Sequence, residues 1–280
     1  MRGYLIDIEF MWGFQARIAG MSKTSSSFPY PPPSTILGAI TEAYSIRKMR
    51  GEGDFLKTLN EISTHLIALS YRSLNAIPMT YQDINRVLAV GQRGGVNYPS
   101  VKDPYGSFDA PARGKTVLVS VDDSPPTLRV ALIVDDLIEL KPEDLWKIKR
   151  IGSKESLVSV VDVVEITPQK VGKPSANDGL TISGVNHSIP LLRGTEIQRI
   201  EGMYITEYFV NIYRKPLTEP PAKLYITSTV EPESEDIVKY IIGLPLGGEE
   251  FKAVVKLSNG LAGYKMRDEV VIGLEPSIRK

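Results

Sequence analysis

Strict alternation of apolar and polar positions opens the chain. Over residues 3–11, one face collects Tyr4, Ile6, Ile8 and Phe10, while the other carries Asp7 and Glu9. Side chains on a strand point alternately to opposite faces, so this pattern predicts a half-buried β-strand.

Helical spacing replaces the alternation after a loop over residues 13–33. Ser34 stands directly after Pro33 as the expected N-cap, and Leu37, Ile40 and Tyr44 follow at helical spacing toward a basic end at Arg50. A second short helix is expected over residues 54–63, followed by a strand over residues 65–71.

Residues 116–121 and 128–134 are apolar and flank an Asp-Asp-Ser-Pro-Pro turn, which predicts a hairpin. Pro142 is expected to open a helix with acids in its first turn and cations in its last, and Gly152 to end it. A strand over residues 157–166 completes the order strand, helix, strand, insertion, strand, helix, strand. That is the order of a ferredoxin-like or RRM-like fold.

The rest of the chain is expected to be mostly β. Its candidate strands are Met203–Tyr213, Lys223–Val230, Ile237–Ile242, Phe251–Leu257 and Glu269–Leu274. Residues 172–186 are expected to form an exposed loop. The sequence therefore predicts an α+β protein with an RRM-like domain over residues 1–170 and a mostly β region over residues 171–280.

The insertion at residues 73–115 is rich in turns, aromatic residues and cations, and it predicts an extended hairpin or long loop. Its later part holds Arg86, Arg93, Lys102, Arg113 and Lys115, interleaved with Tyr81, Tyr98, Tyr105 and Phe108. A single-stranded RNA requires such a mixture, because cations neutralise phosphates and rings stack on bases. The alternative is a solvated loop with ordinary surface charge.

Charge is balanced over the chain, with 33 Lys and Arg against 33 Asp and Glu. The balance is a cancellation, because residues 1–120 hold 13 cations and 9 acids, while residues 121–280 hold 20 and 24. Cysteine is absent, which excludes disulfides, a thiolate nucleophile and Cys-ligated metal sites. The first residues contain no apolar run that would predict a secretory signal, so a cytoplasmic protein without a membrane segment is expected.

Residues typical of catalysis are sparse. The chain has two histidines, His65 and His187, far apart and both interpreted mainly as structural. The acid pairs at Asp122 and Asp135 fit turns better than metal sites, and neither a Walker motif nor a Gly-x-Ser-x-Gly elbow occurs. We therefore expect no catalytic residue, no metal and no cofactor.

Two segments could bind anions. Residues 150–156 form a basic glycine turn between a helix and a strand, with backbone N–H groups and Lys154 available for phosphates. The alternative for this turn is a plain helix C-cap. Residues 28–40 carry a proline run into a helix N-terminus that contains Gly38, and the alternative there is a structural cap.

Together these segments resemble the Cas five family of CRISPR-associated proteins, part of the repeat-associated RNA-binding (RAMP) superfamily with RRM-like folds. The blocks that carry the resemblance are Gly13–Arg17, Tyr30–Gly38 and Arg150–Val160, and the last most resembles the archaeal type I-A branch. The resemblance covers residues 3–160.

The resemblance implies a non-catalytic subunit of a type I Cascade complex that holds the repeat-derived 5′ handle of crRNA in antiviral defence. Its implied partners are the Cas seven backbone subunit, the Cascade large subunit and target DNA within the complex. An inserted hairpin, the thumb, grips RNA in this family, and residues 73–115 stand in its place. The expected RNA contacts are Arg17, Lys23, Arg86, Arg93, Arg113, Lys115, Arg150, Ser153 and Lys154. The alternative is a metal-independent endoribonuclease that processes pre-crRNA, as in one branch of the family.

Overall fold

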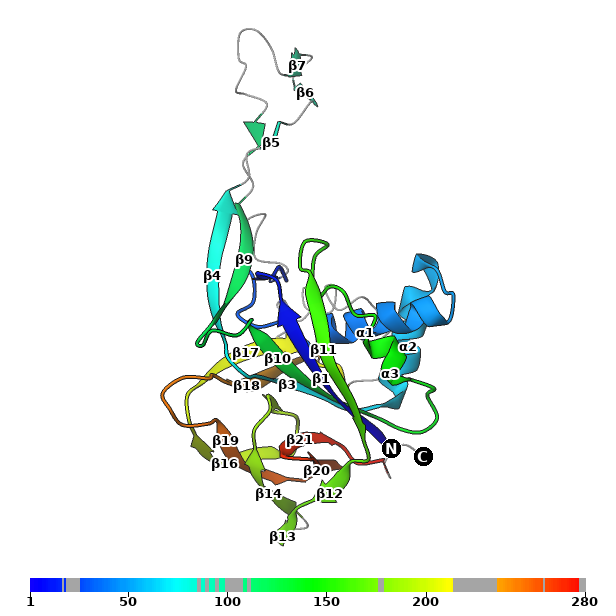
Figure 1. Ribbon diagram of the computed structural model, residues 1–280, viewed down its shortest axis with the longest axis vertical. Helices are drawn as coiled ribbons and strands as arrows, with labels where there is room; N and C mark the ends of the chain where they lie inside the picture. Colours follow the sequence, from blue (N-terminus) through cyan, green and yellow to red (C-terminus); the bar gives the residue numbers. More distant parts are fainter. Residues whose placement is uncertain are drawn as a thin grey trace.

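The structure is a computed structural model of the 280-residue chain. It describes residues 1–16, 18, 26–84, 87–88, 91–93, 96–98, 108–109, 112–175, 179–213, 236–258 and 260–276. For the described residues between 82 and 113, and for Ser175, the description covers the backbone alone. Strands dominate and helices are few, as expected for the α+β class (Figure 1).

A four-stranded antiparallel sheet forms the centre, in the order β11-β1-β10-β3. Its strands are β1 (Arg2–Phe10), β3 (Leu66–Ser73), β10 (Thr127–Val134) and β11 (Val158–Ile166). The alternating face of β1 is buried, with Tyr4, Ile6 and Ile8 fully inaccessible to solvent. The opening strand predicted from that alternation is therefore confirmed.

The helices α1 (Pro33–Arg47), α2 (Phe55–His65) and α3 (Pro142–Leu145), with a short 3₁₀ helix η1 (Glu52–Asp54), lie together on one side of the sheet (Figure 1). The expected cap at Ser34 is wrong. Pro32 occupies the N-cap, and its side chain has no hydrogen-bond acceptor. The helix begins at Pro33, whose fixed φ suits the first helical position, so it starts without a side-chain cap. Helix α1 ends at Arg47 rather than Arg50, and His65 ends α2 instead of opening a strand.

Helix α3 is a single turn, so the helix expected from Pro142 to Gly152 is wrong in its length. Beyond Leu145 the chain continues in tight turns, with the N–H of Lys147 bonded to the carbonyl of Asp144 and that of Ile148 to Leu145. Ile148 and Ile151 are both buried, and the turns allow the chain to bury them.

The insertion forms a long two-stranded ribbon that projects from the body (Figure 1). Strand β4 (Ala76–Ile84) pairs along its full length with β9 (Ala112–Ser120), and β2 (Gly13–Phe14) joins β9 at the base. Two small pairs extend the ribbon, β5 (Val87–Leu88) with β8 (Phe108–Asp109) and β6 (Gly91–Arg93) with β7 (Val96–Tyr98). The extended hairpin predicted for this region is thus present.

The predicted hairpin between residues 116–121 and 128–134 is wrong, because β9 pairs with β4 whereas β10 pairs with β1 and β3. Asn75 holds the connection between β9 of the ribbon and β10 of the central sheet. Its amide donates to Asp122 Oδ1 at 2.9 Å and to the Pro125 carbonyl at 3.0 Å, and it accepts from Thr127 N–H at 2.8 Å.

The described residues after β11 form three small sheets. They are β13-β14-β19-β16 (Lys173–Ser175, Gly179–Val185, Lys252–Leu257, Thr195–Glu201), β15-β18-β17 (Ile189–Pro190, Ile237–Gly243, Tyr204–Val210) and β12-β20-β21 (Gln169–Val171, Leu261–Met266, Glu269–Leu274). Four of the five strands expected here are present, and the fifth, Lys223–Val230, lies outside the described residues.

The loop expected over residues 172–186 is wrong, because β13 and β14 occupy it. Ile182 and Val185 of β14 are buried, and the register shifts between Ser183 and Val185, at Gly184 with φ +74°. The C-terminal part of the chain also contributes to the main core. Phe209 of β17 packs edge-on against Phe28, with ring centroids 5.2 Å apart. None of the helices in the described part of the chain has the length and apolarity needed to span a bilayer.

Candidate nucleic-acid interface

The base of the ribbon is fixed to the loop that precedes α1. Thr116 of β9 donates to the Phe28 carbonyl at 2.6 Å, and a Cβ placed on Gly114 would lie 2.3 Å from the Ser27 nitrogen. Only glycine allows so close an approach of two backbones. Lys115 lies between these two anchor residues and is half-buried.

Residues 150–156 form a turn that packs against the same loop. Ser153 N–H donates to the Gln15 carbonyl at 3.1 Å, and Gln15 N–H donates to Ser156 Oγ at 3.0 Å. Gly152 has φ +110°, and a Cβ on it would approach the Gln15 oxygen to 2.8 Å. Two of the three sequence blocks that carried the resemblance therefore meet at Gln15.

The third block, Tyr30–Gly38, runs into α1. Its Tyr30 contacts the ribbon, and Glu42, farther along α1, contacts the turn. Tyr30 is buried and its hydroxyl donates to the carbonyl of Ala76, the first residue of β4, at 2.7 Å. Burial raises the pKa of Tyr30, so its hydroxyl stays protonated as a donor. On α1, Glu42 accepts two hydrogen bonds from Arg150, at 2.9 and 3.0 Å.

The expected contact residues of the turn differ in availability. Arg150 is engaged by Glu42, and Ser153 Oγ bonds Glu155 at 2.9 Å. Lys154 is exposed and joins no ion pair within the described part of the chain. A phosphate would meet Lys154 directly, whereas it would have to compete with Glu42 for Arg150.

The ribbon brings an aromatic ring beside a cation. Tyr81 of β4 and Lys115 of β9 are register partners, so their side chains share one face, and Tyr81 is 45% exposed. This neighbouring pair is one example of the cation and aromatic mixture expected from the sequence.

Several predicted contacts cannot be compared with the structure. Arg17, Lys23 and Arg86 lie outside the described residues, while Arg93 and Arg113 are described by their backbone in β6 and β9. Within the described residues, no cluster of acids or histidines is arranged to hold a metal ion.

The histidines are held by protein groups. His65 Nδ1 lies 2.9 Å from Asp135, and His187 is fully buried, with Nε2 3.2 Å from Glu269. Burial lowers the pKa of His187, and the nearby arginines Arg72 and Arg129 act in the same direction. His187 is therefore neutral near pH 7.

Sequence reasoning missed a buried charge network around Glu269, which is 2% exposed. Glu269 accepts from Arg129 at 2.8 Å and from Arg72 at 3.0 Å. Burial raises the pKa of Glu269, but hydrogen bonds from His187 and Arg129 and the charge of Arg72 outweigh it and hold the pKa at about 2. A signal was present, since Arg129 is the single charged residue inside the otherwise apolar strand β10.

Comparison with known proteins adds three likenesses. Residues 3–127 match the family model described as CRISPR-associated protein (Cas_Cas5). The CRISPR-associated protein Cas5 2 of Saccharolobus solfataricus is 30% identical over 165 residues, which make up 58% of this chain and 61% of that relative. The match thus spans about three fifths of the relative's length. The crystal structure of a CRISPR protein from Archaeoglobus fulgidus is 36% identical with a TM-score of 0.70, covering 98% of this chain and 99% of that one.

Proposed function

The chain belongs to the Cas5 (Cas five) family of CRISPR-associated proteins and has a role in CRISPR defence, and on this premise we propose that it is a non-catalytic crRNA-binding subunit. In this proposal it works in the cytoplasm of an archaeon, within a type I-A Cascade complex. It holds the repeat-derived 5′ handle, caps the Cas seven backbone and contacts the large subunit. The resemblance of residues 150–160 to the type I-A branch favours this subtype.

The proposal includes the architecture. We assign residues 1–170 to a ferredoxin-like (RAMP) domain with an inserted thumb, followed by a mostly β region over residues 171–280. The strand order β11-β1-β10-β3, with helices in both connections, supports this assignment.

One observation carries the RNA-binding proposal. The loop before α1 is bonded at Phe28 to the base of the ribbon and at Gln15 to the turn that bears Lys154. Three segments far apart in the sequence are therefore joined, with Lys154 on one flanking segment and Lys115 on the other. A single-stranded backbone that crosses these segments would meet a cation on each flank.

The non-catalytic part of the proposal draws support from the histidines. A metal-independent ribonuclease needs a general acid and base that reach the RNA. His187 is buried against Glu269, and His65 is paired with Asp135. Incubation of the purified chain with repeat RNA in EDTA tests this directly. Intact RNA is expected, and cleavage that is lost in His65→Ala or His187→Ala would establish the ribonuclease instead.

The binding proposal is tested by removing both lysines. We expect Lys154→Ala with Lys115→Ala to weaken binding of RNA that carries the repeat-derived handle by about tenfold. The salt dependence should also weaken, by about 0.7 in slope for each phosphate that is no longer neutralised. Lys57→Ala with Lys265→Ala removes two exposed lysines elsewhere and is the matched control. Equal affinities of the two double variants would overturn the site.

A further inference from the structure

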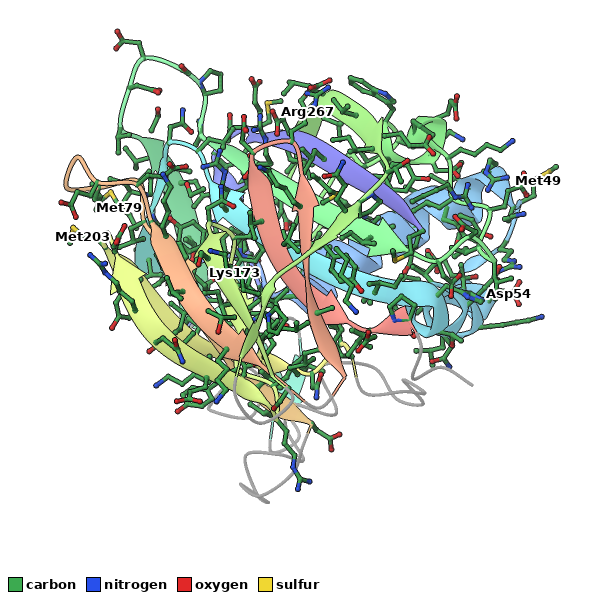
Figure 2. The ribbon with its side chains drawn as sticks, turned by 90° about the horizontal axis from the view of Figure 1, so that it is seen from below. Met49, Asp54, Met79, Lys173, Met203 and Arg267 are labelled. Atoms are coloured by element: carbon green, nitrogen blue, oxygen red, sulfur yellow. The ribbon has the colours of Figure 1, made fainter. Side chains whose placement is uncertain are left out.

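The helical layer carries a cluster of exposed apolar side chains at the end of α1 and the start of α2. Its members are Ile46, Met49, Phe55 and Leu56, which are 48%, 93%, 36% and 38% exposed. We call this cluster the α1–α2 patch. Figure 2 shows Met49 at the edge of the molecule, extending away from the body, with Asp54 on the same side. A soluble chain rarely gathers such residues without a partner.

Met49 occupies a backbone position that does not suit it. The N–H of Arg50 bonds the Ser45 carbonyl at 3.0 Å and that of Met49 bonds Ile46 at 3.2 Å, which together form a Schellman end to α1. This motif places Met49 in the left-handed region, at φ +51°, where glycine is favoured and a residue with a side chain is strained. The side chain is almost fully exposed, so the folded chain offers no compensating contact. Such a local conflict indicates that the side chain contacts something outside the chain.

A groove continues the patch along α1. It has a volume of about 620 Å³, with Gly38, Ala39 and Ser45 of α1 among its lining residues and Phe55 and Glu52 also lining it. Glu42 of α1 and Arg150 and Gly152 of the neighbouring turn line it as well. Small residues on a helix face allow another helix to approach closely. The lined stretch of α1, from Thr35 to Ile46, spans about three turns. These dimensions suit one short helix.

The charge around the patch favours a basic protein segment over RNA as the bound partner. The cations at this end of α1 are already neutralised, since Arg47 pairs with Asp144 at 2.7 Å and Lys48 with Glu139 at 3.1 Å. Glu52 and Asp54 are exposed and form no ion pair with any residue that the structure describes. Lys57, next to Leu56, is also exposed and joins no ion pair among the described residues, so two acids stand against one cation and the net unneutralised charge beside the patch is negative. It repels an RNA backbone and attracts lysine and arginine.

We propose that the α1–α2 patch and its groove bind an amphipathic helix of another protein subunit. Apolar residues of that helix, at a spacing of three and four, would cover Ile46, Met49 and Phe55, and its flanking cations would reach Glu52 and Asp54. This inference rests on the proposed role of the chain as a subunit of a CRISPR effector complex. It assigns to that role a protein-binding surface that borders the turn of residues 150–156 at Arg150 and Gly152 and includes neither Lys154 nor the ribbon.

A photo-crosslinking residue at position 49 tests the occupant. The complex is purified through a tag on this chain from cells that carry its CRISPR locus, then irradiated. A crosslink to one peptide with apolar residues at helical spacing and flanking lysine or arginine supports the proposal. A crosslink to RNA, to a second copy of the chain or to a peptide without cations would overturn it, as would an intact complex without any crosslink. Position 203 is the matched control, because Met203 is 51% exposed and lies across the molecule from Met49 in Figure 2.

Substitution of Met49 separates binding from folding. Met49→Gly relieves the left-handed strain, so the isolated chain is expected to melt about 2–4 °C higher, while recovery of the partner falls at least about tenfold. Glu52→Lys with Asp54→Lys is expected to cause the same loss of partner, and Met203→Ala none. Partner recovery at the wild-type level in both patch variants would refute the docking surface.

RNA provides the readout that distinguishes the two proposals. Patch variants are expected to retain handle RNA while losing the protein partner. If the wild-type complex contains the partner but no RNA, the proposed RNA-binding function fails and the docking surface stands. If patch variants lose RNA and keep every subunit, the docking surface is refuted.

Discussion

Arg129 lies opposite Asp7 across strands β1 and β10, and its guanidinium bonds both Asp7 oxygens at 2.7 Å. A third nitrogen of Arg129 reaches Glu269 of β21 at 2.8 Å. The same Glu269 oxygen accepts from Arg72 of β3 at 3.0 Å. A buried network thus joins the central sheet to the C-terminal strands and fixes how the two parts of the chain pack.

Removal of Glu269 is expected to destabilise the fold strongly. Glu269→Ala leaves Arg72 and Arg129 with one acceptor fewer in a buried site, which costs about 3 kcal/mol in the free energy of unfolding. Urea unfolding measures the loss. Asp123→Ala, on an exposed turn, is the control and should change stability by less than about 0.5 kcal/mol. A similar small effect in both variants would contradict the structural role of the network.

Stability is expected to fall at acid pH in two steps. The pKa of His187 is lowered by burial, so the unfolded chain binds a proton below about pH 6.5 that the folded chain resists. The pKa of Glu269 is held at about 2, so its contribution is present above about pH 4.3 and is lost as the pH falls toward 2. Urea unfolding between pH 8 and pH 3 measures both steps.

His187→Gln isolates the first step, because glutamine does not titrate. The wild-type chain should lose up to about 1.4 kcal/mol per pH unit more than this variant at about one pH unit below 6.5. Identical pH dependence of the two proteins would show that His187 is not held neutral in the fold.

The sequence predicts best where a local pattern decides the structure. Alternation located β1, and an apolar run located β21. Strand β14 was missed because its glycine, serine and threonine residues resemble a loop, and its burial depends on pairing with β19, far along the chain. The wrong hairpin has the same cause, since β9 and β10 are neighbours in sequence but pair with other strands.

For the candidate site, too, local motifs could be predicted from the sequence and long-range contacts could not. The basic turn at residues 150–156 was visible in the sequence, and so was the insertion that forms the ribbon. The engagement of Arg150 by Glu42 was not visible, because the two residues lie 108 positions apart. Local motifs indicate which groups can bind RNA, while tertiary contacts decide which of them are available.

Gly114 is expected to control the position of the thumb. A methyl group there would collide with the backbone of Ser26 and Ser27, so Gly114→Ala should cost about 1–3 kcal/mol and separate the ribbon from the loop. RNA affinity should fall with it, as measured by filter binding and thermal unfolding. Gly53→Ala adds a methyl group in open space and should leave both properties unchanged. Wild-type RNA affinity in Gly114→Ala would show that the ribbon base does not position RNA contacts.

Glu42 is expected to compete with RNA for Arg150. Glu42→Gln removes the charge that holds the guanidinium, so the variant should bind handle RNA several-fold more tightly, with a steeper salt dependence. Titrations at several salt concentrations measure both quantities. An unchanged affinity would assign Arg150 a structural role alone.

The most direct test of the central claim is ultraviolet crosslinking of the purified complex, with both the peptide and the nucleotide identified. The proposed function predicts crosslinks from residues 13–28, from the insertion at residues 73–115 and from residues 150–156 to nucleotides of the repeat-derived 5′ end. Crosslinks confined to other parts of the chain, or to RNA without that 5′ sequence, would contradict it.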